Sequence, residues 1–272
     1  MLEQLNEELC GFVELHRNGQ ILEIRMVKPK VNAICRRFSR SLEMAALYLQ
    51  ETPDLRVGIL SSGSEKAFSA GLDFRESISS GFEKGPGAKE GGFGGITKLW
   101  RLKKPLIAAI NAPAIGGGME LALACDIIVM AEEAYFQLPE MKRGLLPDGG
   151  GLQRLPKRIP YNVATAMIWT GEPMTAAEAL RWGLVYRTAP RGELMDLAWQ
   201  LARRVAEGAP LAMQALKETL RYTDCLPDRD AMELRAESAG DLENFRRMLA
   251  SNDMIEGQRA FLEKREPRWT GT

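Results

Sequence analysis

The stretch Asn111–Glu120, NAPAIGGGME, joins three consecutive glycines to a carboxylate and runs on into the apolar segment LALACD. The residues before it have the pattern of a buried strand, and a helical pattern begins near Met119. A glycine turn that leads into a helix exposes unpaired backbone N–H groups at the positive end of the helix dipole. The segment therefore predicts an anion-binding turn beside Gly117, with the carboxylate of Glu120 about one helical turn away.

A phosphate group is one anion that such a turn can hold, but the sequence lacks the residues that phosphate motifs need. No Gly-Lys-Ser/Thr follows the glycines, as a P-loop requires. Gly116 and Gly118 fit the start of a dinucleotide fingerprint, but Leu121 stands where its third glycine belongs. Two interpretations remain open. The turn holds a developing oxyanion with Glu120 as proton carrier, or the glycines serve packing and the carboxylate only complements the helix dipole.

The overall composition limits the kinds of partner. The chain has 272 residues, 45% of them hydrophobic, and its 36 Lys and Arg balance its 36 Asp and Glu, so nucleic-acid or anionic-membrane binding is not favoured. The four cysteines are widely separated, which indicates reduced thiols rather than disulfides or a zinc site. Because the N-terminus is acidic and no apolar stretch is long enough for a membrane helix, we expect a cytoplasmic protein.

Histidine is nearly absent from this sequence. The single one, His16, lies in VELHRNGQILEI, where we expect an exposed strand position. Catalytic triads and histidine-based metal sites therefore lack their usual residues, and we expect no metal site. If the protein is an acid–base enzyme, its proton carriers should be carboxylates.

The order of the patterns along the chain predicts an α/β fold. A hairpin is expected around Asn18-Gly19, a helix over residues 39–50, and buried strands in LRVGIL, PLIAAIN and CDIIVMA. Alternation of this kind favours parallel pairing. From about Asn162 onward the sequence looks wholly helical, so we expect an α/β core at residues 1–190 and a helical region at 191–272. The glycine-rich residues 81–95 are expected to form a surface loop.

Two further segments contain candidate site residues. In KAFSAGLDF, residues 66–74, small side chains precede Leu72, so its N–H is a candidate second oxyanion donor. In AYFQLPEMKRGLLPDGGGLQRL, residues 134–155, Glu140 follows Pro139. For both segments a plain structural interpretation is open, namely a strand-to-helix turn and a dipole-complementing glutamate.

Together, the three segments resemble the enoyl-CoA hydratase/isomerase (crotonase) superfamily, and the resemblance continues from residue 12 to residue 269. It implies a spiral of ββα units with a helical C-terminal trimerisation region, assembled as a homotrimer or a dimer of trimers. It also implies an acyl-CoA thioester as substrate and no metal or redox cofactor, with coenzyme A present only as part of the substrate.

The resemblance also assigns roles to residues of the three segments. It places the oxyanion-hole N–H groups at Leu72 and Gly117. It assigns the water or hydroxyl at Cβ to Glu120 and the proton at Cα to Glu140. Because both glutamates are present, a hydratase is favoured over a double-bond isomerase or another enolate-using member. One departure from many hydratases is the stretch that starts at Asp148, Asp-Gly-Gly in place of Gly-Ala-Gly, which leaves the acyl specificity open.

The resemblance further implies substrate-binding positions in several regions. As isolated residues, the lysines and the arginine among them are more often solvated surface charges. The positions are Lys28, Lys30, Ala70, Asp73, Gly116, Lys264 and its neighbour Arg265, with Phe261 as a candidate contact for the adenine ring.

Within the superfamily, KPKVNAI, GGFGGITKL, LPEMKRGLLPDGGG and EKREPRWTG resemble the carnitinyl-CoA dehydratase branch. This branch implies a trimethylammonium on the acyl group, and Phe93 or Trp100 is then a candidate aromatic contact for it. The alternative is that both aromatic residues belong to the core.

A more distant alternative is RNA binding, because one relative of this family binds AU-rich RNA through a lysine-rich helix. The corresponding segment here, SRSLEMAALYLQETPD, contains one arginine and no lysine. Since RNA binding needs a positive surface, the sequence disfavours it.

Overall fold

The computed structural model describes residues 5, 9, 11–80, 87–233 and 242–272. Two compact units make up the chain, and each is described by itself. The first comprises Met1–Leu102 with Leu106–Ala202, and the second comprises Lys103–Pro105 with Arg203–Thr272. These units are defined by their compactness, whereas the boundary after residue 190 was predicted from the change to a helical sequence pattern. That boundary therefore stays a prediction.

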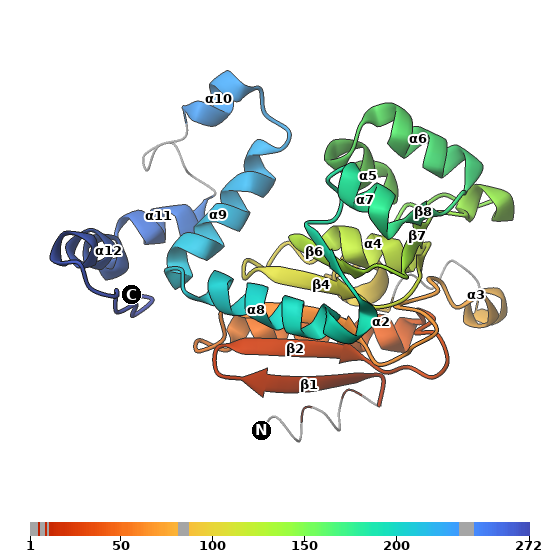
Figure 1. Cartoon of the computed structure of the whole chain (residues 1–272), viewed down its shortest axis with the longest axis horizontal. Helices are drawn as coiled ribbons and strands as arrows, with labels where there is room; N and C mark the ends of the chain where they lie inside the picture. The colour runs from red at the N-terminus through yellow and green to blue at the C-terminus, as the bar shows by residue number, and fades with distance from the viewer. Residues whose placement is uncertain (1–4, 6–8, 10, 81–86, 234–241) are drawn as a thin grey trace. The chain divides into compact units, whose positions relative to one another are not determined.

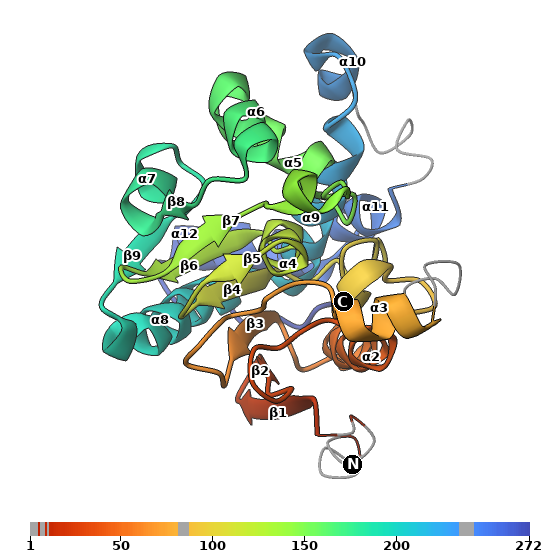
Figure 2. The ribbon, with the colours of Figure 1, turned by 90° about the vertical axis from the view of Figure 1, so that its right-hand side faces the viewer.

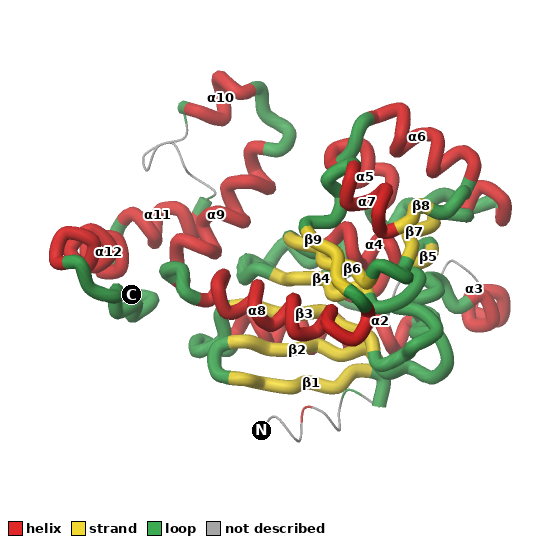
Figure 3. Tube along the Cα trace, viewed as in Figure 1, coloured by secondary structure: helices red, strands yellow, loops and turns green. Residues whose placement is uncertain are grey.

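A six-stranded sheet forms the centre of the first unit (Figures 1 and 3). Every pair of neighbouring strands in it is parallel except the first pair, which is an antiparallel hairpin. In spatial order the strands are β1 (Val13–Asn18), β2 (Ile21–Met26), β3 (Val57–Ser62), β4 (Leu106–Ile110), β6 (Ile127–Ala131) and β9 (Arg187–Ala189). The predicted α/β fold with parallel pairing is confirmed.

The hairpin is present, but its turn is shifted by one residue from the prediction. Asn18 pairs with Ile21, so Gly19 and Gln20 form the turn, and only Gly19 has a positive φ, of 58°. His16 lies on β1 with its side chain exposed, as expected.

A second, three-stranded sheet brings the site segments together. It consists of β5 (Ala114–Ile115), β7 (Tyr135–Gln137) and β8 (Met174–Thr175). A bridge between Ser69 and Ala114 connects it to the segment that precedes Leu72. The expectation of a wholly helical chain after Asn162 was wrong for β8 and β9. Their two and three residues carry too little periodicity to predict, and pairing with a neighbouring strand makes them extended.

Helices cover both faces of the six-stranded sheet. Figure 2 shows α2 on one side of it and α8 on the other. The helix α2 buries an apolar stripe that includes Phe38, Leu42 and Leu49. The helices that lie wholly or mostly in the first unit are α2 (Arg36–Glu51), α3 (Phe74–Ser80), α4 (Gly117–Ala124), α5 (Gly151–Arg158), α6 (Tyr161–Thr170), α7 (Ala176–Arg181) and α8 (Leu194–Ala206), with short 3-10 turns η2 (Phe93–Gly95), η3 (Glu140–Arg143) and η4 (Arg191–Glu193).

The glycine-rich segment is a surface loop in only part of its described range, because Lys89 and Glu90 are exposed but the glycines after them are buried. Residues 81–86 lie outside the described residues, whereas Gly91, Gly94 and Gly95 are buried against α2. An added Cβ at Gly95 would lie 2.0 Å from the carbonyl oxygen of Ser39. The expectation was therefore wrong here, because glycine permits close backbone packing as well as exposed turns.

The second unit is helical (Figure 3). Its helices are α9 (Pro210–Thr223), α10 (Asp228–Met232), α11 (Glu243–Leu249) and α12 (Asn252–Glu263). The carboxylate of Glu218 accepts hydrogen bonds from the first turn of α11, and that of Asp253 accepts from the backbone N–H groups of Thr270 and Gly271. Within the residues that the structure describes, every helix is too short or too polar to cross a membrane.

Candidate active site

A cavity of about 400 Å³ opens in the first unit where the three segments singled out in the sequence converge. Parts of α2, the turn before α3, η2, the start of α4, and η3 with the loop after it contribute to its walls. Among the expected site residues, the cavity is lined by Ala70, Leu72, Phe93, Gly116, Gly117, Glu120 and Glu140.

Two backbone segments meet at one wall of this cavity. The N–H of Ile115 donates to the carbonyl of Ser69 at 2.9 Å. Gly71, with φ of 78°, lies so close that an added Cβ would be 2.8 Å from the nitrogen of Gly117. Only glycine fits such an approach with this backbone conformation. The segment before Leu72 and the glycine turn are therefore one packed unit.

This unit presents two N–H groups on the cavity wall. The carbonyl of Gly71 and the N–H of Asp73 pair with Ile34, so the N–H of Leu72 faces away from that residue. The N–H of Gly117 belongs to the first residue of α4, where no helical acceptor exists. Neither group donates to another described residue. Two unpaired donors on adjacent backbone segments suit a developing oxyanion.

Glu120 projects from the first turn of α4 and is only 4% exposed. Its Oε1 accepts a hydrogen bond of 2.9 Å from the N–H of Gly151, the first residue of α5. Burial raises the pKa of Glu120 to about 7. The charges of Glu140 and Asp148 add to the rise, and the backbone hydrogen bonds of Gly151 and Gly149 oppose it. A carboxyl group with such a pKa exchanges protons near neutral pH.

Glu140 is the first residue of η3 and faces the same cavity. Its Oε1 lies 2.6 Å from the position of an added Cβ at Gly116, and its Oε2 is buried without a hydrogen-bond partner. Burial raises the pKa of Glu140. Its own N–H and Arg143 oppose this rise, and the charge of Asp148 adds to it. A buried, unsatisfied carboxylate oxygen marks a position for a proton, a water molecule or a ligand.

Phe93 packs against both parts of this site. An added Cβ at Gly117 would lie 2.2 Å from its Cε1, and one at Gly149 would lie 3.2 Å from its Cδ1. The ring therefore supports the glycine turn on one side and the segment around Glu120 on the other. An added Cβ at Gly149 would also lie 2.5 Å from Oε2 of Glu120. The Asp-Gly-Gly departure noted in the sequence thus includes a glycine that leaves room for the carboxylate.

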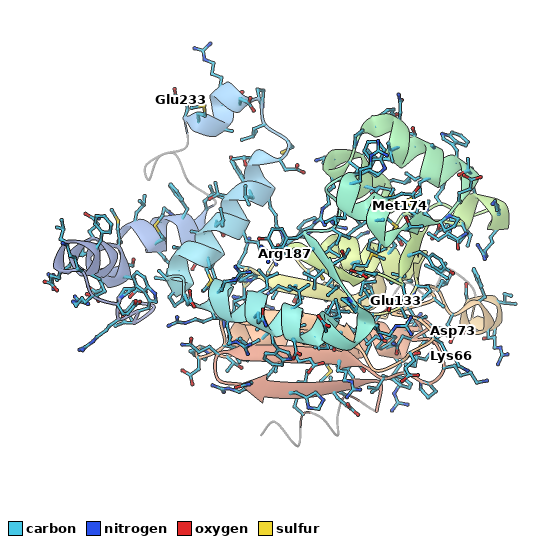
Figure 4. All side chains as sticks on the ribbon, in the orientation of Figure 1. Lys66, Asp73, Glu133, Met174, Arg187 and Glu233 are labelled. Atoms are coloured by element: carbon cyan, nitrogen blue, oxygen red, sulfur yellow. The ribbon has the colours of Figure 1, made fainter. Side chains whose placement is uncertain are left out.

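Lys28 and Asp73 form an ion pair outside the lining of the cavity. The Lys28 ammonium lies 2.8 Å from Oδ2 of Asp73 and donates to the carbonyl of Ala33 at 2.7 Å. Burial works against the charge of Asp73, but Lys28 and the N–H groups at the start of α3 outweigh it and hold its pKa below the usual range. Asp73, labelled in Figure 4, lies in the loop before α3. The pair thus links this loop to the segment after β2.

The remaining expected residues lie apart from the cavity lining or in the second unit. Trp100 is 59% exposed, with the Arg154 guanidinium 6.0 Å from its ring centre. Lys30 is exposed and has a positive φ. Phe261 and Lys264 belong to the second unit, at the end of α12. Their binding roles stay predictions.

Glu43, which no sequence pattern singled out, has a fully buried side chain on α2. Its carboxylate accepts hydrogen bonds from the N–H groups of Lys89, Glu90 and Gly91. A glutamate beside an apolar helical stripe is ordinary in sequence, so no local pattern signals this role.

Comparisons with known proteins match this chain to one family. A family model described as enoyl-CoA hydratase/isomerase matches residues 16–272. The chain is 46% identical over 262 residues to a carnitinyl-CoA dehydratase of Salmonella agona (strain SL483), covering 95% of this chain and 98% of that protein. A carnitinyl-CoA dehydratase of Salmonella paratyphi C (strain RKS4594) matches with the same values.

Solved structures give the same result. The crystal structure of an enoyl-CoA hydratase from Mycobacterium tuberculosis H37Rv superposes with a TM-score of 0.85 at 38% identity, covering 96% of this chain and 100% of that one. An enoyl-CoA hydratase from Mycobacterium marinum superposes with a TM-score of 0.86 at 37% identity and the same coverage. The resemblance of the three sequence segments to the enoyl-CoA hydratase/isomerase superfamily is confirmed.

Proposed function

The chain belongs to the enoyl-CoA hydratase/isomerase family and is a hydro-lyase of the enoyl-CoA hydratase type, and from this premise we propose how its own residues perform the reaction. The thioester carbonyl oxygen of a 2-enoyl-CoA lies between the N–H groups of Leu72 and Gly117. Glu120 and Glu140 carry the two protons. The observation that carries the proposal is that both carboxyl groups have raised pKa values and face the cavity that holds both donors.

In the hydration direction, ionised Glu120 accepts a proton from water as the water oxygen bonds to Cβ. The electron pair of the Cα–Cβ double bond moves toward the thioester oxygen, where negative charge develops. The N–H groups of Leu72 and Gly117 stabilise that charge, and loss of one such fixed donor typically costs about 10²–10³ in rate.

The second half of the reaction is protonation at Cα. Protonated Glu140 gives its proton to Cα, and the electron pair returns from the oxygen to restore the thioester carbonyl. The product is a 3-hydroxyacyl-CoA. Glu120 is left protonated and Glu140 ionised, so exchange of one proton with solvent resets the pair. Dehydration follows the same steps in reverse.

For the acyl group, we propose a short chain that ends in a trimethylammonium, as in crotonobetainyl-CoA and carnitinyl-CoA. The 46% identity to carnitinyl-CoA dehydratases supports this substrate. Asp148 also supports it, because this exposed carboxylate lines the cavity and makes no hydrogen bond or ion pair with another described residue. A cation beside Asp148 and the ring of Phe93 gains both a counter-charge and an aromatic face. Trp100 is less suited, since it lies outside the cavity lining.

Three thioesters test this proposal: crotonobetainyl-CoA, its uncharged isostere 5,5-dimethylhex-2-enoyl-CoA, and crotonyl-CoA. Water addition is followed by mass spectrometry, and kcat/KM is compared. We expect all three to be hydrated, with the cation preferred over its isostere by about 3- to 30-fold. Equal values for the cation and its isostere would remove the trimethylammonium substrate. A double bond that moves with no water added would replace the hydratase by an isomerase.

Two further parts of the proposal come from the resemblance to the family. Lys30, Phe261 and Lys264 are proposed to contact the coenzyme A portion, whereas Lys28 already pairs with Asp73 and Arg265 with Glu256 and Glu263. The exposed apolar side chains of α12, among them Phe261 and Ile255, support a homotrimer or a dimer of trimers.

A further inference from the structure

Glu43 is a buried charge that the proposed reaction does not use. We propose that it is a positioning residue, which fixes the ring of Phe93 against the Gly117 turn through the backbone of residues 89–95. The effect on catalysis rests on the proposed function, whereas the effect on the backbone does not.

The carboxylate of Glu43 is surrounded by donors from one short segment. Its Oε2 accepts from the N–H of Lys89 at 3.0 Å, and its Oε1 accepts from the N–H groups of Glu90 at 2.5 Å and Gly91 at 2.8 Å. The Arg40 guanidinium on the same helix also binds it. Successive N–H groups that converge on one anion form a nest, and here the anion is part of the protein itself.

The segment continues from this nest to Phe93 through a compact turn. The carbonyl of Gly91 accepts from the N–H of Lys98 at 2.8 Å, and the carbonyl of Phe93 accepts from the Thr97 hydroxyl at 2.7 Å. The N–H of Gly94 donates to the Ser39 hydroxyl at 3.1 Å, so α2 holds the segment on both sides of Phe93.

Glycines make this close packing possible. An added Cβ at Gly95 would lie 2.5 Å from the nitrogen of Glu43, and one at Gly94 would lie 2.4 Å from Cδ2 of Leu121 on α4. The turn is therefore packed between the helix that carries Glu43 and the helix that begins at Gly117. Displacement of the turn moves the Phe93 ring relative to both.

A neutral side chain of the same shape cannot replace the carboxylate. Glutamine offers one oxygen acceptor, and its NH₂ group would face backbone N–H donors. It also loses the charge that pairs with Arg40. Burial opposes the ionised form of Glu43, but the three N–H groups and Arg40 outweigh it and keep the pKa below the usual value, so the anion persists at neutral pH.

A double-mutant cycle separates positioning from general stability. Glu43→Gln, Phe93→Leu and the double variant are compared by kcat/KM for hydration of crotonyl-CoA, with the folded fraction measured by circular dichroism. We expect Glu43→Gln to lower kcat/KM by about 10- to 100-fold in the wild-type background, because small displacements at a catalytic site are costly. In the Phe93→Leu background the same change should cost less than about 3-fold. Equal losses in both backgrounds would overturn the proposal.

The matched control is Glu90→Gln. Glu90 lies in the same segment, but its exposed side chain pairs with Arg101 and only its backbone N–H reaches Glu43. This variant should keep the wild-type kcat/KM. If Glu43→Gln does not fold, Glu43→Asp enters the same cycle, since it keeps the charge but withdraws it by one methylene.

Hydrogen exchange tests the structural part without any turnover. In Glu43→Gln, the amides of residues 89–95 should exchange faster, while those of β4 keep their protection. Unchanged exchange at Phe93 and its neighbours would overturn the positioning role. A wild-type protein that hydrates no enoyl-CoA would overturn the proposed function and leave this measurement valid.

Discussion

Glu43 and Glu120 are both buried glutamates on helices, and both accept hydrogen bonds from backbone N–H groups, yet their pKa values move in opposite directions. Burial by itself would raise the pKa of both residues. Around Glu43 three N–H groups and an arginine outweigh it. Around Glu120 the backbone donors are fewer, and two further carboxylates reinforce the effect of burial. The donors and neighbouring charges therefore decide whether a buried glutamate is a fixed anion or a proton carrier.

The opposite pKa shifts also suit Glu43 and Glu120 to different roles. A fixed anion can hold a backbone segment in place at every physiological pH, but it cannot release and recover a proton. Glu120 has the opposite properties, because burial and the neighbouring carboxylates raise its pKa to about 7.

The largest effect should come from making the same Glu→Gln change at the proton carriers. Glu120→Gln and Glu140→Gln should each lower kcat at least about 100-fold, because glutamine keeps the shape but cannot carry a proton. Both variants should fold. Steady-state hydration of crotonyl-CoA provides the measurement, with Glu132→Gln on the exposed surface as control. Wild-type turnover in either variant would remove that residue from the proposed mechanism.

A smaller effect should follow from crowding Glu120 without removing it. In Gly149→Ala, the new Cβ would lie 2.5 Å from Oε2 of Glu120, so the carboxylate must move. We expect kcat to fall by at least about 10-fold. Gly192→Ala is the matched control, since an added Cβ there meets nothing within 4 Å. If the two alanine variants were equally active, the placement of Glu120 would not depend on this glycine.

The smallest effect should be a shift of the pH profile. Hydration needs ionised Glu120, whose pKa is about 7, so kcat/KM should decline as the pH falls through about 7. Asp148→Asn removes a negative charge that raises the pKa of both Glu120 and Glu140, so this acidic limb should move to lower pH. The preference for crotonobetainyl-CoA over its isostere should fall as well. The control Asp54→Asn, on the surface, should leave the pH profile unchanged. If the acidic limb of the profile did not move in Asp148→Asn, the effect of Asp148 on the pKa of Glu120 would be contradicted.

Much of the site could be predicted because its signals are local. The strand, glycine turn and helix around Gly117 follow one another within a few residues, and Glu120 is fixed relative to them by helical geometry. Parallel pairing followed from the alternation of strands and helices.

The features that were missed depend on long-range contacts. The donors to Glu43 come from residues 89–91, more than forty positions along the chain, so its own helix carries no sign of them. The burial of Gly91 and Gly95 depends on α2 in the same way. The ion pair between Lys28 and Asp73, 45 positions apart, could not be predicted either, whereas the substrate-binding roles that the resemblance implies for both residues stay predictions.

The contrast between the two carboxyl groups can be measured directly by carbon-13 NMR of protein labelled at the glutamate side-chain carboxyls. The signal missing from Glu120→Gln identifies Glu120, and the signal missing from Glu43→Gln identifies Glu43. In a titration from pH 8 to pH 4.5, the Glu120 signal should move with a midpoint near 7, whereas the Glu43 signal should titrate only below the usual range of a glutamate. A Glu120 signal that remained ionised down to pH 4.5 would contradict the account.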